Sequence, residues 1–300
     1  MKTLGIVEVG STNTKAYKYE NGAVKDLGFK NIEFRKNYDS LGYISEIDID
    51  LLASYINSCF DDSTDIYVYG TSIFRFAQNV QGFEKSLLSR TKIKSFEVVS
   101  IEDENKYTVM GAIKDVSITE NICVYIGGGG STEISICKNG EIIEEVHTSF
   151  GVTDIKKIFP DLSNDLAVTD IEIVSLYAKK YLNLPKTKAR YMILAGGDFI
   201  LRCKAGYPTR ANNLFISKNH PLTITYKDHR QHDDRFFHEI KLSDLAQKHS
   251  PDNPRWWDGA RANCAMVNVV AKAVDVETIF PTKIAMVYGI LDRKLQISKV

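Results

Sequence analysis

The chain has 300 residues, which is more than one hydrophobic core usually supports, so two domains are expected. It carries 38 basic and 38 acidic side chains, so no net charge attracts nucleic acid or a membrane surface, and neither partner is expected. Its five cysteines lack a Cys-x-x-Cys spacing and no apolar run approaches about 18 residues, so the sequence predicts a cytoplasmic protein without zinc, disulfides, a signal peptide or a membrane span.

The first predicted element is a strand, a turn and a second strand, and the sequence contains this unit twice. Residues 5–24 and 123–142 each begin as a short apolar strand that runs into a turn rich in Gly, Ser and Thr. An alternating strand follows and leads to an Asn-Gly pair, which is the strongest short signal for a hairpin. The two units align without a gap, so each half of the chain is predicted to open with the same hairpin.

Turns of this composition suit an anionic ligand. A hairpin tip without bulky side chains lets backbone N–H groups point at a phosphate. One such tip is also a common structural turn, but two matching tips indicate duplicated domains that clamp a phosphate-bearing ligand between them. This arrangement resembles that of the actin and sugar-kinase superfamily.

Strands and helices alternate along the rest of the chain, which predicts an α/β fold. We expect helical stretches over 48–60, 72–90, 152–158, 165–181, 259–275 and 282–295, and strands over 65–70, 94–99 and 190–195. Ser100, with Asp103 three residues later, is a predicted N-cap. A boundary within 117–120 divides the chain into domains 1–118 and 119–300. The superfamily resemblance implies two ribonuclease-H-like, actin-like domains with mixed sheets flanked by helices and a cleft between them.

Five stretches, in order, resemble the exopolyphosphatase/guanosine pentaphosphate phosphatase (Ppx/GppA) family and together span essentially the whole chain. They are GIVEVGSTNT (5–14), YGTSIFRFAQN (69–79), FEVVSIEDENKYTVMGA (96–112), GGGGSTEISI (127–136) and RANCAMVNVVAKAVDVETI (261–279). The second and third stretches are specific to the family, whereas the glycine loops are shared across the superfamily. The chain looks like a short form without the C-terminal helical region of longer members.

The resemblance implies roles for individual residues in phosphate hydrolysis, a reaction that needs a positioned water and compensation for charge on the transferred group. It places the general base at Glu104, although an acidic residue there would also complement the helix dipole. It places a guanidinium clamp on phosphate at Arg75, for which a surface ion pair is the alternative. The expected phosphate-binding residues are Gly10, Ser11, Thr12, Asn13, Arg75, Gly128, Gly129, Gly130 and Ser131.

The family has an aspartate two residues before each loop glycine, where it can hold a divalent cation. Glu8 stands at the first position and keeps the charge, so it could hold Mg²⁺ or Mn²⁺ through water. Ile126 stands at the second position and cannot coordinate a metal. Glu133, just past the second loop, is a further candidate for orienting water or metal.

These residues predict a hydrolase that releases terminal phosphate from polyphosphate or a guanosine pentaphosphate-type nucleotide, with a homodimer as one expected assembly. Because Ile126 removes a carboxylate, a catalytically impaired regulator that binds phosphate or nucleotide stays open as the alternative. A divergent kinase is less favoured, since no adenosine-binding motif is legible.

Residues 202–238 are rich in basic side chains and contain four of the six histidines. This segment could follow a long polyanion or form an ordinary solvated surface. His229 and His232 have the spacing of metal ligands on a helix, but the sequence places no third ligand beside them, so chance spacing stays open as well.

Overall fold

The computed structural model describes residues 3–11, 13–196 and 198–297. The chain packs as two compact units, Met1–Tyr107 with Gly289–Val300, and Thr108–Tyr288. It passes from the first unit to the second within α4 (Ile101–Ile113) and returns within α11 (Met286–Ile297). The domain boundary expected at residues 118 and 119 stays a prediction.

The first unit is built on a five-stranded mixed sheet with the order β3-β2-β1-β4-β5. The strands are β1 (Leu4–Val9), β2 (Asn13–Glu20), β3 (Ala23–Asn31), β4 (Asp65–Gly70) and β5 (Ile93–Val98). The first three strands form an antiparallel meander, and β4 and β5 run parallel to β1. This is the ribonuclease-H-like strand order that the resemblance implied.

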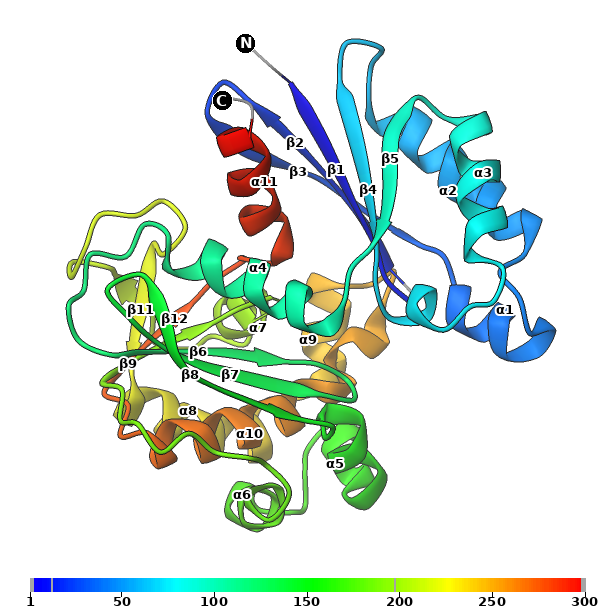
Figure 1. The fold of residues 1–300 in the computed structure, drawn as a ribbon. Helices are drawn as coiled ribbons and strands as arrows, with labels where there is room; N and C mark the ends of the chain where they lie inside the picture. The colour runs from blue at the N-terminus through cyan, green and yellow to red at the C-terminus, as the bar shows by residue number, and fades with distance from the viewer. Residues whose placement is uncertain (1–2, 12, 197, 298–300) are drawn as a thin grey trace. The chain divides into compact units, whose positions relative to one another are not determined.

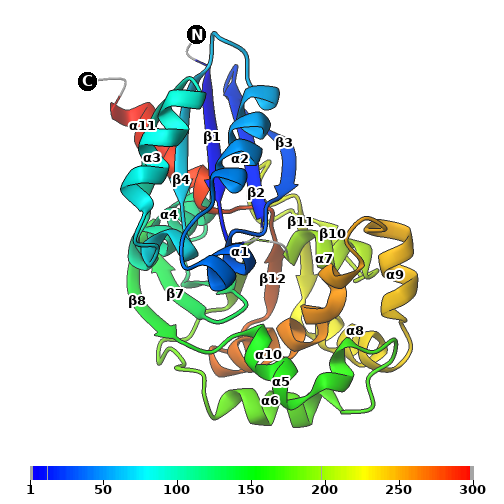
Figure 2. The ribbon, with the colours of Figure 1, turned by 90° about the vertical axis from the view of Figure 1, so that its right-hand side faces the viewer.

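Helices cover one face of this sheet, and Figure 2 shows α2 lying across it. The helical segments of this part of the unit are α1 (Phe34–Leu41), α2 (Glu46–Cys59), the 3-10 turn η1 (Ser72–Arg75) and α3 (Val80–Arg90). Leu52 and Ile56 of α2 and Phe83 of α3 pack on Val7 and Val68 of the strands in one buried cluster. Burial of this apolar face is what holds the helices on the sheet.

The second unit is built on a seven-stranded sheet with the order β10-β11-β12-β9-β6-β7-β8. The strands are β6 (Ile122–Gly127), β7 (Thr132–Lys138), β8 (Glu141–Thr148), β9 (Tyr191–Leu194), β10 (Arg210–Ala211), β11 (Leu222–Thr225) and β12 (Thr278–Pro281). Strands β6 to β8 form an antiparallel meander, while β9 and β12 are parallel to β6. The order β8-β7-β6-β9-β12 therefore repeats that of the first unit, and β11 and β10 extend its edge.

The two hairpins of the repeat turn as the Asn-Gly pairs predicted. Asn21 and Gly22 have φ values of 53° and 82°, and Asn139 and Gly140 have values of 51° and 81°. Two successive positive φ angles define the tight hairpin turn that matches strand twist. The repeat read from the sequence is confirmed in both topology and turn geometry.

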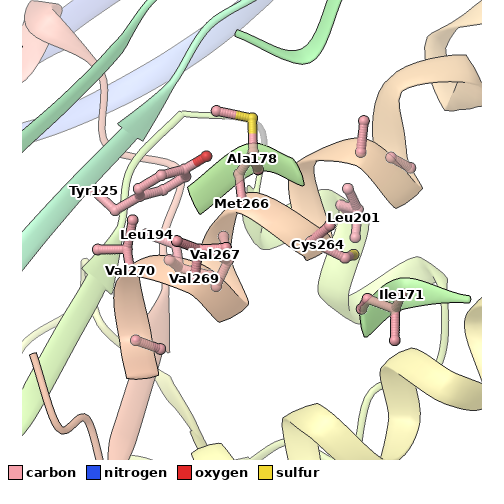
Figure 3. Packing of buried hydrophobic residues seen from close by; sticks show 14 of the residues in the cluster. Tyr125, Ile171, Ala178, Leu194, Leu201, Cys264, Met266, Val267, Val269 and Val270 are labelled. Atoms are coloured by element: carbon pink, nitrogen blue, oxygen red, sulfur yellow. The ribbon is translucent and has the colours of Figure 1, made fainter. Parts of the chain in front are cut away.

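A layer of helices lies against the second sheet, with α6, α8 and α10 side by side in Figure 1. The helical segments of this unit, besides its part of α4, are α5 (Val152–Ile158), η2 (Pro160–Ser163), α6 (Ile171–Lys179), α7 (Asp198–Lys204), α8 (Tyr226–His238), α9 (Leu242–His249), η3 (Pro254–Gly259) and α10 (Ala260–Ala273). Helix α10 is buried along most of its length. Figure 3 shows its Met266 and Val270 packed near Tyr125 and Leu194 of the sheet.

The predicted elements are largely confirmed, and the differences are one helix that is divided and helices that begin at other residues. Ser100 Oγ accepts the N–H of Asp103 at 3.0 Å, as the N-cap prediction requires. The helix expected over 72–90 is divided, because Ser72 has a φ of 53° and a 3-10 turn precedes α3. The helix expected from residue 165 begins only at Ile171, after a loop fixed by Asp161. Among the described residues, no helix is long and apolar enough to cross a membrane.

Candidate active site

The two glycine loops have the same backbone geometry. The N–H of Gly10 donates to the carbonyl of Asn13 at 3.0 Å, and the N–H of Gly128 donates to that of Ser131 at 2.9 Å. A Cβ added at either glycine would lie 3.2 Å from the carbonyl oxygen that accepts this hydrogen bond. Because these two N–H groups are used inside the loops, any amide donor for a ligand must come from the residues that follow each glycine.

The first loop is fixed to neighbouring segments of its unit. Ser11 Oγ donates to Ser72 Oγ at 2.6 Å, and the carbonyl of Ser11 accepts the N–H of Arg35 at 2.9 Å. Asn13 begins β2 and is exposed. Thr12 lies outside the described residues, so its predicted role stays a prediction. The Ser11–Ser72 bond joins the loop to the 3-10 turn that ends at Arg75.

Arg75 and Glu104, the two family-specific residues, form an ion pair within the first unit. The Arg75 Nη2 group contacts the carboxylate of Glu104, and Arg75 Nε donates to the carbonyl of Val99 at 2.7 Å. The side chain of Arg75 is 17% exposed and that of Glu104 is 38% exposed. Two fixed contacts on different nitrogens hold the guanidinium in one orientation while the carboxylate stays accessible to water.

The tip of the second glycine loop is exposed, and its carbonyl groups are bonded to the N-terminus of α5. Gly129 and Gly130 are exposed, and no hydrogen bond within the described part of the chain uses their N–H groups. The first N–H groups of α5, from Val152 and Thr153, donate to the carbonyls of Gly128 and Gly129 at 3.1 and 2.8 Å. These helix N-terminal donors would otherwise lack partners. Loop and helix therefore stabilise each other.

Gly151, which precedes α5, is a supporting residue that the sequence analysis missed. A Cβ at this position would come 2.6 Å from the carbonyl oxygens of both Gly128 and Gly129. Only glycine permits this approach of the α5 N-terminus to the loop. The available signal was a glycine immediately before a predicted helix, but its contact with a loop more than twenty positions away is not local.

Ile126 and Glu133 face each other on adjacent strands, β6 and β7. Ile126 packs against an apolar cluster that includes Val109 and Ile113 of α4, so it serves the core. Glu133 is largely buried, and its Oε1 lies 3.0 Å from His147 Nδ1. No group of three or more His, Cys, Asp or Glu side chains with metal-binding geometry occurs among the described residues.

Glu8 shows the feature expected of a cation ligand. Its Oε2 atom is buried and accepts no hydrogen bond from the described residues. A buried carboxylate oxygen without a donor is costly unless a cation or ordered water completes it. Mg²⁺ commonly binds one or two carboxylates and completes its shell with water and substrate phosphate, so Glu8 fits such a role.

The histidine-rich segment is part of a buried polar network and does not form a basic surface strip at its centre. Arg202 Nε donates to His229 Nε2 at 2.9 Å, and His229 Nδ1 lies 3.1 Å from Asp233 Oδ2. Arg202 and His229 are both fully buried. His232 Nε2 lies 2.9 Å from the carbonyl of Ala205. Both ring nitrogens of His229 face other side chains, and no third metal ligand lies beside it among the described residues. The spacing of His229 and His232 therefore does not indicate a metal site.

This network reaches the base of the second loop. Asp198 lies 3.3 Å from Arg202 Nη1 and accepts Asn263 Nδ2 at 2.8 Å. The Tyr125 hydroxyl donates to Asn263 Oδ1 at 3.1 Å, and a Cβ on Gly127 would lie 2.5 Å from that hydroxyl. Burial raises the pKa of Asp198. The close approach at Gly127 explains why this position, one residue before the loop, has no side chain.

Comparison with known proteins agrees with this architecture. The Ppx/GppA phosphatase family matches residues 30–248. No curated protein matches the chain. The Ppx/GppA phosphatase of Aquifex aeolicus is 15% identical with a TM-score of 0.74, and the match covers 97% of this chain and 98% of that one. An exopolyphosphatase from Cytophaga hutchinsonii is 15% identical with a TM-score of 0.73, covering 98% of both chains. The solved structures share the fold over nearly the whole chain, and the family model matches most of its residues. This chain therefore belongs to the Ppx/GppA phosphatase family.

Proposed function

We propose that this protein is a phosphoanhydride hydrolase that releases the terminal phosphate of polyphosphate or of a guanosine pentaphosphate-type nucleotide. The observation that carries the proposal is the ion pair between Arg75 and Glu104, beside a glycine loop tied to the same 3-10 turn. Membership in a phosphatase family supports the reaction class.

In this reaction Glu104 accepts the proton of the attacking water, and Arg75 moves its Nη2 contact to a phosphate oxygen as the substrate binds. The Val99 carbonyl keeps the Arg75 guanidinium oriented through Nε during that exchange. Charge on the transferred phosphoryl group grows in the transition state, so an oriented guanidinium stabilises it more than the ground state. Departure of Arg75 leaves Glu104 a stronger base, because the neighbouring positive charge is then shared with phosphate.

The amides of the loops and the side chains of Ser11, Asn13 and Ser131 bind the remaining phosphate oxygens. Glu8 would hold Mg²⁺ or Mn²⁺, with Glu133 as a further candidate, and the bound cation would neutralise phosphate charge. Thr12 keeps its proposed place in the first loop. None of these assignments requires a covalent intermediate with the protein.

A regulator that binds the same ligands without turnover is the second candidate. The packing of Ile126 in the apolar cluster favours it, since the side chain at that position supports the core and brings no carboxylate to the loop. Loss of one metal-holding carboxylate lowers catalysis more than binding, because the cation acts mainly on charge that develops in the transition state.

Phosphate release from polyphosphate and from guanosine pentaphosphate, with Mg²⁺ or Mn²⁺, separates the two candidates. The wild type is compared with Glu104→Gln and with Glu102→Gln, a matched control in the same first turn of α4. A hydrolase loses release only in Glu104→Gln. If all three proteins release nothing yet are stabilised thermally by the ligand, the chain is a binding protein and the hydrolase proposal fails.

A further inference from the structure

A pocket of about 610 Å³ opens on the helical layer of the second unit. It is lined by residues of α6, α8 and α10, three helices that pack against one another (Figure 1), and by Lys188 in the loop before β9. This volume is within the range of about 300 to 1,000 Å³ that holds small-molecule ligands in proteins. None of its lining residues belongs to the glycine loops or to the Arg75–Glu104 pair.

The rim of this pocket, called here the α6–α8–α10 pocket, is basic. Four basic residues line it, namely Lys179, Lys188, Arg230 and Lys272. Glu172 is the acidic lining residue, and it already pairs with Arg230 at 2.6 Å. Lys188 pairs with Asp275 at 3.1 Å. Lys179 and Lys272 make no ion pair or hydrogen bond within the described part of the chain, so two ammonium groups are available to an anion.

The lining of the pocket also includes apolar side chains. Leu176, Tyr226 and Val269 provide apolar contacts. Asn268 is only 4% exposed, and its Nδ2 donates to Asp233 at 2.7 Å. Its Oδ1 accepts no hydrogen bond from the described residues. The amide of Asn268 therefore belongs to the buried polar network with Asp233, and the apolar side chains are what the pocket offers a ligand besides the lysines.

We propose that the α6–α8–α10 pocket binds a nucleotide. Lys179 and Lys272 contact its phosphate groups, and the planar base lies on the apolar surface of Leu176, Tyr226 and Val269. Inorganic polyphosphate would bind the lysines but would leave the apolar surface of the pocket without a contact, which is why a nucleotide fits better. The proposal does not depend on the hydrolase activity and adds a second ligand site.

The test is photolabelling of the full chain with 8-azido-GTP and 8-azido-ATP in EDTA, followed by peptide mapping. Metal is omitted because the pocket holds the ligand by lysines. The expected label lies on peptides of α6, α8 or α10. The variant with Lys179→Glu and Lys272→Glu should lose at least about tenfold in labelling of these peptides, since charge-assisted phosphate contacts are replaced by repulsion.

A matched control carries the same charge change elsewhere on the unit. The control variant carries Lys180→Glu at the C-cap of α6 and Lys248→Glu on α9. Both lysines are exposed and lie outside the pocket lining, so this variant should label like wild type. In Arg75→Ala the label on these helices should persist. Failure of the proposed hydrolase site at Arg75 and Glu104 would therefore not affect the proposed nucleotide site. Label found only outside α6, α8 and α10 overturns the proposal. Equal competition by inorganic tripolyphosphate also overturns it, because the site would then recognise a bare polyanion.

Discussion

Arg75 and Glu104 are 29 positions apart in the sequence and form an ion pair in the first unit. The same arginine also donates through Nε to the carbonyl of Val99, which precedes the N-cap of α4. The candidate base and the candidate phosphate clamp are therefore positioned by one another before any substrate arrives. This arrangement makes the geometry of the guanidinium, as well as its charge, testable.

Arg75→Lys keeps the positive charge and removes the planar guanidinium, which donates hydrogen bonds in several fixed directions. A lysine ammonium cannot hold the Val99 carbonyl and Glu104 in the same two-point geometry, so kcat should fall at least about tenfold while the protein stays folded. Arg90→Lys, at an exposed ion pair with Glu46 and Asp50, is the control and should leave kcat unchanged. Steady-state phosphate release measures both, and equal kcat in wild type and Arg75→Lys contradicts the clamp.

Ile126→Asp should raise turnover and lower stability. A carboxylate there restores the cation-holding group that the family resemblance implies, whereas burying it in the cluster with Val109 and Ile113 costs about 2 kcal/mol of unfolding free energy. Urea unfolding and the Mg²⁺ dependence of phosphate release measure the two effects. Ile142→Asp, which changes another partly buried side chain packed against the same cluster, on β8, serves as the control and should lose stability without a gain in rate. A substituted protein that is destabilised but no faster would argue against a metal role at position 126.

Gly151→Ala should disrupt the second loop. Its Cβ would come 2.6 Å from two loop carbonyl oxygens, so the loop and α5 must separate, with a loss of about 1 to 3 kcal/mol in unfolding free energy and weaker ligand binding. Gly82→Ala, on α3 and outside both glycine loops, is the matched control, because its Cβ would meet nothing within 4 Å. Denaturant midpoints and thermal shifts with polyphosphate compare the two. Similar behaviour of both variants would show that the loop does not rely on α5.

Buried histidines should make the second unit acid-sensitive. Burial lowers the pKa of His220 to about 4, and it also lowers the pKa values of His229 and His232. The unfolded chain takes up protons below its ordinary histidine pKa of about 6.5, whereas the folded unit does not, so stability is lost as pH falls from about 6.5 toward 4. His220 alone accounts for roughly 3 kcal/mol of that loss.

Urea unfolding at several pH values measures this dependence. His220→Gln should flatten the decline between pH 6.5 and 4, while His238→Gln, at a partly exposed site, should not. The prediction fails if the two variants have the same pH profile as wild type.

The sequence alone determined the elements that depend on neighbouring residues. The Asn-Gly turns, the Ser100 N-cap and the internal repeat follow from short-range rules of φ angle, hydrogen bonding and alternation, and the structure has all of them. The family resemblance singled out Arg75 and Glu104 on local motifs as well.

Only the tertiary structure decided which distant groups meet and which charges are buried. The composition of residues 202–238 suggested a basic surface, yet Arg202 and His229 pair inside the core, 27 positions apart. Gly151 showed only a local signal, a glycine before a predicted helix, and Asn268 showed none, because the contacts that these two residues make come from other elements. Burial is a property of the packed chain and not of any short stretch of it, which is the physical reason why pattern alone could not place these residues.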